Sequence, residues 1–176
     1  MTIPNLITIL RLILVPAVIV AIIQGRWETA FGLFLVAGIS DGIDGFIARR
    51  FDMRSEFGAY IDAVADKALL VSIYVSLAVV GVLPGWLAIV VVSRDIMIIG
   101  AIIISWLMGR PVAIQPLTIS KLNTAVQIAF AALFLFKMAF GFELGRFDLA
   151  AMWVVAALTA ASAAAYLAGW LRHMAA

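Results

Sequence analysis

Cysteine is absent from this 176-residue sequence, histidine occurs once, and charged residues are scarce. Without cysteine, disulfides play no part in the fold. Charged residues make up 12% of the chain and apolar residues 66%, a balance that excludes an ordinary soluble domain and indicates a membrane protein. The net charge is only +2 and comes from clustered arginines, so nucleic acid is not an expected partner. We interpret His173, in the C-terminal tail, as solvated.

The sequence also lacks an internal repeat and a basic region before its first apolar stretch. Apolar residues begin at Ile3 and Arg11 interrupts them, which favours a retained first helix over a cleavable signal peptide. Six apolar segments are each long enough to cross a bilayer at about 1.5 Å per residue. We therefore predict an all-α integral membrane protein, a single domain over residues 1–176 with six transmembrane helices in one bundle. The helices are expected at 4–24, 28–50, 56–82, 85–108, 118–140 and 149–171.

Basic residues are distributed unevenly between the predicted loops. The loop between the second and third segments holds Arg49, Arg50 and Arg54. The loops on the opposite side hold Arg26 and Arg146. Because arginine and lysine accumulate in cytoplasmic loops, we predict that both termini face the cytoplasm and that the chain resides in the cytoplasmic (inner) membrane.

The most informative stretch is the pattern D-x2-D-G-x2-A-R-x8-G-x3-D-x3-D, which runs from Asp41 to Asp66. On a helix, Asp41 and Asp44 share one face, and Asp62 and Asp66 share another. Carboxylates in an apolar setting cost free energy unless a cation compensates them, and two divalent ions would balance these four. Hard oxygen ligands suit Mg²⁺ or Mn²⁺, so we predict a site for two such ions. A charged helix hairpin at the membrane surface is the alternative.

The predicted depths of the aspartates agree with a shared site. Asp41 and Asp66 each lie about nine or ten residues from the intervening loop, roughly 14 Å along antiparallel helices. The four carboxylates can therefore converge in a pocket that opens to the cytoplasm. Gly45 and Gly58 remove side-chain bulk beside them, which leaves room for a ligand or for close helix approach.

This pattern resembles the signature of the CDP-alcohol phosphatidyltransferase family at every fixed position. The resemblance implies that family's fold and a metal-dependent transfer of a phosphatidyl group from CDP-diacylglycerol, with CMP as the leaving group. It implies that Asp41, Asp44 and Asp62 bind metal and that Asp66 both binds metal and acts as the catalytic base. It also implies a homodimer. The residues expected to line the CDP portion are Gly45, Ala48, Arg49 and Gly58.

Two further regions are similar to members of this family. In the first helix, Asn5 and Thr8 form a polar stripe with Arg11 and are expected to extend the CDP site. The alternative is an interfacial N-cap region with a snorkelling arginine. Residues 93–97 and 119–127 look like the family's cardiolipin synthases.

From this second likeness we assign an acceptor site to Arg94, Lys121 and Arg110. Charges inside a membrane segment are functional candidates by default. For Arg94 and Asp95 the alternative is a structural ion pair to a neighbouring helix, and Lys121 could instead contact anionic lipid headgroups.

Two acceptors compete for this site, phosphatidylglycerol and glycerol 3-phosphate. Family members that use glycerol 3-phosphate typically carry cations at the positions of Ile102 and Asn123. Because a phosphomonoester dianion favours several cations, we predict phosphatidylglycerol as the acceptor and cardiolipin as the product. Glycerol 3-phosphate, giving phosphatidylglycerophosphate, is the alternative. A divalent-cation transporter is a more distant one, because the acids lie in one hairpin and no repeat is visible.

Overall fold

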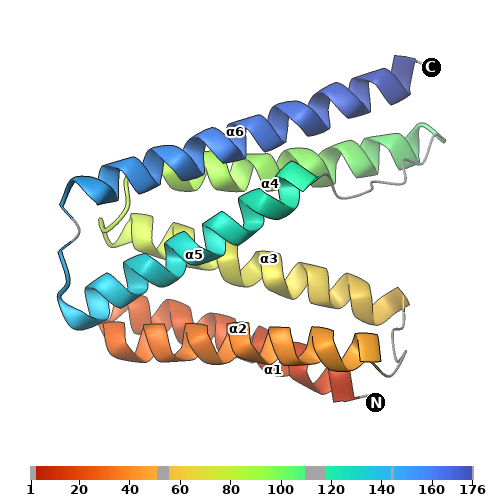
Figure 1. Ribbon diagram of the computed structural model, residues 1–176. Coiled ribbons are helices and arrows are strands. Elements are labelled where there is room, and N and C mark those ends of the chain that lie inside the picture. The colour runs from red at the N-terminus through yellow and green to blue at the C-terminus, as the bar shows by residue number, and fades with distance from the viewer. Residues whose placement is uncertain (1–2, 51–55, 110–117, 144, 176) are drawn as a thin grey trace. The chain divides into compact units, whose positions relative to one another are not determined.

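The computed structural model of this chain is helical throughout its regular structure (Figure 1). It describes the backbone of residues 3–50, 56–109, 118–143 and 145–175, and the side chains of 13–40, 67–109, 118–143 and 145–174. Within these ranges there is no strand, as the sequence predicts. The helices are α1 (Ile3–Ile23), α2 (Trp27–Arg50), α3 (Glu56–Val79), α4 (Gly85–Leu107), α5 (Thr118–Phe140) and α6 (Arg146–Ala175).

Two helix boundaries differ from the prediction by several residues. The third helix ends at Val79, because Gly81 adopts a φ of 77° and the amides of Val82 and Leu83 both donate to the Leu77 carbonyl. The sixth helix begins at Arg146 and is 30 residues long. Its first turn includes an aspartate, a residue that the helix dipole favours there, and its alanine-rich body has high helix propensity.

Length and composition agree with an integral membrane protein. Three described helices are long and apolar enough to cross a bilayer, namely Gly85–Leu107, Thr118–Phe140 and Arg146–Met174. The parts of α1, α2 and α3 with described side chains form shorter apolar helices. Many large apolar side chains are exposed along these helices, which suits a lipid surrounding and not water.

The chain folds into two compact units. The first comprises Met1–Leu83 and Ala131–Glu143. In it, α1 packs against both α2 and α3, and Val18, Ile22 and Phe34 are buried. The C-terminal part of α5 belongs to this unit. In this part of α5, Phe136 packs edge-to-face against Phe31 of α2, with ring centroids 5.6 Å apart.

The second unit comprises Pro84–Phe130 and Leu144–Ala176. In it, α4 runs along α6 (Figure 1). The ring centroids of Trp86, in the first turn of α4, and Trp153, in the N-terminal third of α6, lie 5.3 Å apart. Apolar side chains such as Leu87 and Val91 are buried on α4. The same helix also buries two charged residues.

Candidate functional site

The four predicted metal ligands lie on helical backbone. Asp41 and Asp44 belong to α2, and Asp62 and Asp66 belong to α3. The spacings of three and four residues therefore place each pair on one helix face. Helix α1 packs against both of these helices, so three elements of the first unit carry the predicted donor site. The side chains of these aspartates lie outside the described ones.

The predicted CDP contacts are distributed over the same three helices. Asn5 and Thr8 lie on α1, Gly45, Ala48 and Arg49 lie on α2, and Gly58 lies on α3. Their side chains are also outside the described set, and Arg110 lies outside the described residues altogether. Among the side chains that the structure describes, no group of three or more histidines or carboxylates could hold a metal ion. The metal prediction therefore depends on the aspartates of α2 and α3.

Arg94 and Asp95 form a buried ion pair near the middle of α4. Their exposed fractions are 5% and 7%, and Arg94 Nη1 lies 2.5 Å from Asp95 Oδ1. A buried charge without a partner would be strongly unfavourable, so pairing within the helix makes their burial possible. This ion pair forms between neighbours on one helix, whereas the alternative interpretation of the sequence expected a pair with a neighbouring helix.

The remaining polar contacts of Arg94 reach two other helices. Nη2 donates to Ser162 of α6 at 2.9 Å and to Ser120 of α5, and Nε also donates to Ser162, at 3.3 Å. The guanidinium carbon lies 5.7 Å from the ring centroid of Tyr166. A guanidinium has five N–H donors, and four bonds of this kind leave one, on Nη1. Arg94 thus ties α4, α5 and α6 together with most of its donors already used.

A polar cluster continues from this point between α5 and α6. Gln127 Nε2 donates to Thr159 Oγ1, and that hydroxyl donates to Asn123 Oδ1, both at 3.0 Å. All three residues are buried, and Asn123 Nδ2 has no hydrogen-bond partner among the described residues. We define the α5–α6 polar cluster as Ser120, Asn123, Gln127, Thr159 and Ser162.

The residues that α6 contributes to this cluster are not among those predicted from the sequence. Within the alanine-rich stretch of α6, Thr159, Ser162 and Tyr166 follow an i, i+3, i+7 pattern on one helix face. On α5, Ser120, Asn123 and Gln127 have the same spacing. Matching polar stripes on two apolar helices are a signal that could have predicted this contact.

Lys121 lies next to this cluster but has a different environment. It is exposed in the first turn of α5, directly after Ser120, and forms no ion pair with a described side chain. Of the two predicted acceptor cations with described side chains, Arg94 is buried and neutralised by Asp95, whereas Lys121 is accessible. One accessible positive charge is therefore available beside the cluster.

Comparison with known proteins supplies the family. A family model described as CDP-alcohol phosphatidyltransferase matches residues 1–162. This match includes all of the predicted donor-site residues and both acceptor segments.

Several curated proteins are similar over nearly the whole chain. A probable cardiolipin synthase (CMP-forming) of Drosophila melanogaster is 36% identical, covering 93% of this chain and 56% of that protein. The cardiolipin synthase (CMP-forming) of Homo sapiens is 34% identical, with 93% and 59% covered. A probable phosphatidylglycerophosphate synthase of Mycobacterium tuberculosis is 32% identical, with 97% and 82% covered. The chain thus spans a little over half the length of the two cardiolipin synthases.

Proposed function

The chain belongs to the CDP-alcohol phosphatidyltransferase family, and from this membership we propose that it transfers a phosphatidyl group from CDP-diacylglycerol to a glycerol-type acceptor, releasing CMP. The observation that carries the proposal is the complete aspartate pattern, placed on α2 and α3 with each pair on one helix face. The relatives named as CMP-forming synthases support the same reaction class.

The donor site is proposed to use two Mg²⁺ or Mn²⁺ ions, because four carboxylate oxygen donors suit hard divalent cations. Asp41, Asp44, Asp62 and Asp66 would hold them, and the bound ions would neutralise the pyrophosphate and the leaving oxygen of CMP. Asp66 is also proposed to take the proton from the acceptor hydroxyl.

The other donor-site residues would hold the nucleotide and its pyrophosphate. Arg49 would supply a cation to a phosphate, because its planar guanidinium matches phosphate oxygens. Gly45, Ala48 and Gly58 are small residues and would leave room for the CDP group, with Asn5 and Thr8 of α1 as polar contacts.

The acceptor is proposed to be phosphatidylglycerol, with cardiolipin as the product. Arg94 is already paired with Asp95, and Asn123 is a neutral residue bonded to Thr159, so Lys121 is the accessible cation of this region among the described side chains. A single cation suits the single charge of a phosphodiester better than the dianion of a phosphomonoester. Arg110, in the preceding loop, would add to the same site.

Glycerol 3-phosphate is the second candidate acceptor. The similarity to a probable phosphatidylglycerophosphate synthase favours it, and that relative is covered over a larger share of its length than the cardiolipin synthases are. Both reactions release CMP, so the acceptor alone distinguishes them.

A competition assay tests the acceptor. Purified protein receives CDP-diacylglycerol, Mg²⁺ or Mn²⁺, and equal concentrations of phosphatidylglycerol and glycerol 3-phosphate, and the lipid products are separated. We expect cardiolipin as the main product. If phosphatidylglycerophosphate dominates and no cardiolipin forms, glycerol 3-phosphate is the acceptor.

The membrane placement completes the proposal. Both termini and the opening of the donor site would face the cytoplasm, because arginines gather at the end of α2 and in the segment that follows it. The family resemblance also supports a homodimer.

A further inference from the structure

An open groove in the first unit is lined by α1, α2 and the turn between them. These two helices pack side by side (Figure 1). Its volume is about 500 Å³, within the range of known small-molecule sites. Apolar and small side chains line most of it, among them Pro16, Ala17 and Val20 of α1. At one end the lining becomes polar, with Gln24, Arg26 and Thr29 around the turn between the helices.

The polar end of the groove contains side chains that are not used inside the protein. Arg26, Gln24 and Thr29 are all exposed, and none of their side chains forms a hydrogen bond or ion pair with a described residue. Arg26 makes no ion pair with Glu28, which lies outside the groove lining. An unpaired guanidinium with neutral polar neighbours is a site for an anionic oxygen group.

The position of this end in the membrane identifies the ligand class. Arg26 lies in the short turn between two apolar helices, so it is at the level of the lipid headgroups. Trp27 follows it at the beginning of α2, as expected of an interfacial anchor. A phosphate at Arg26 would leave an acyl chain free to lie along the apolar part of the groove.

We propose that this groove is a binding site for a phospholipid, held by its phosphodiester at Arg26 and by one acyl chain between α1 and α2. The polar end of the groove is separate from the predicted donor site. Thr8 lies on α1 and Gln24 directly follows that helix, 16 residues later, which corresponds to about 24 Å at the helical rise. The proposal therefore does not depend on the proposed transferase activity.

Native mass spectrometry of the purified full chain can test the site. The probe is dioleoylphosphatidylethanolamine, which is neither the proposed donor nor the proposed acceptor. We expect Arg26→Gln to raise the dissociation constant of the first bound lipid by about tenfold or more, because a charge-assisted hydrogen bond is lost. Ala17→Phe should weaken binding as well, because it fills the groove.

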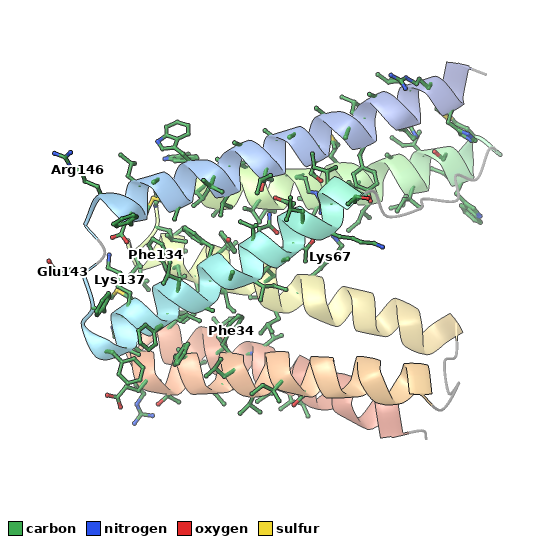
Figure 2. The ribbon with its side chains drawn as sticks, in the orientation of Figure 1. Phe34, Lys67, Phe134, Lys137, Glu143 and Arg146 are labelled. Atoms are coloured by element: carbon green, nitrogen blue, oxygen red, sulfur yellow. The ribbon has the colours of Figure 1, made fainter. Side chains whose placement is uncertain are left out.

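Arg146→Gln is the matched control. Arg146 is an exposed cation at the beginning of α6 and is not part of the groove lining (Figure 2). Its substitution should leave lipid affinity unchanged. Inorganic phosphate and dioleoylglycerol should each bind far more weakly than the phospholipid, because each offers only one half of the ligand.

Three results would overturn the proposal. One is unchanged affinity in Arg26→Gln, which decides the question even if Ala17→Phe fails to fold. The second is an equal loss of affinity in Arg146→Gln. The third is a change of oligomeric state in Ala17→Phe at unchanged lipid affinity, which would mean that a second copy of the chain covers the groove.

Discussion

Ser162 of α6 accepts two hydrogen bonds from Arg94 of α4, at 2.9 Å from Nη2 and 3.3 Å from Nε. Both residues are buried, and the hydroxyl offsets part of the cost of removing a guanidinium from water. Because Arg94 also donates to Ser120 of α5, one side chain joins three helices of the second unit. Lys121, the accessible cation, follows Ser120 directly.

Ser162→Ala should destabilise the protein by leaving two donors of a buried guanidinium without their acceptor. We expect a loss of about 1–3 kcal/mol, which corresponds to a fall of roughly 2–10 °C in the unfolding midpoint for a chain of this size. Thermal unfolding in detergent measures it. Ser93→Ala, at an exposed serine beside Arg94, is the control and should have little effect. Equal midpoints for the two variants would refute a stabilising role for Ser162.

Thr159→Val should remove the hydroxyl that links the side-chain amides of Gln127 and Asn123, while nearly preserving side-chain volume. Interhelical hydrogen bonds in membrane proteins average about 0.6 kcal/mol, and Thr159 takes part in two. We therefore expect about 1–2 kcal/mol of destabilisation, measured by the same unfolding assay.

Thr124→Val is the matched control for Thr159→Val. Thr124 is exposed and its hydroxyl bonds only the Ser120 carbonyl of its own helix. A double-mutant cycle with Gln127→Leu should give a coupling energy for the Thr159 pair. Strict additivity in that cycle would show that the hydrogen bond contributes nothing.

The helices and the donor motif could be predicted from the sequence, because both depend on local patterns. Long apolar runs and turn residues such as Gly25 and Pro84 fix where helices begin and end, and all six predicted helices are present within a few residues. The aspartate spacing likewise predicts which carboxylates share a helix face once α2 and α3 form. The identity of two metal ions stays a prediction.

The environment of Arg94 could not be predicted, because it depends on residues distant in the sequence. Ser162 is 68 positions away and Ser120 is 26 positions away. Both are neutral, so no opposite charge in the sequence indicates that they bind Arg94. The sequence assigned Arg94 to the acceptor, and that assignment stays a prediction. The structure adds that most of its donors are engaged within the chain. Any contact with the acceptor would use the N–H that remains on Nη1.

Chelation should abolish activity if the aspartates of α2 and α3 hold divalent ions. We expect no phosphatidyl transfer in excess chelator and recovery when Mg²⁺ or Mn²⁺ is restored. The measurement is product formation at each step, with the fold followed by circular dichroism. Full activity in excess chelator would rule out the metal site.

Because the chain contains no cysteine, single introduced cysteines can test its orientation in the membrane. Ser55→Cys and Pro84→Cys are made separately, and intact cells are treated with a membrane-impermeant thiol reagent. We expect protection at position 55 and labelling at position 84, because the arginine-rich loop is predicted to face the cytoplasm. The reverse pattern would invert the topology.

Release of CMP from CDP-diacylglycerol tests the central claim most directly. Purified protein with Mg²⁺ should release CMP only when an acceptor is present, and Asp62→Asn should reduce the rate by orders of magnitude without changing the unfolding midpoint by more than a few degrees. Glu143→Gln, at an exposed acid after α5, should release CMP at the unaltered rate. If the unaltered chain releases no CMP with either phosphatidylglycerol or glycerol 3-phosphate, or if Asp62→Asn is as active as Glu143→Gln, the proposed transferase function is contradicted.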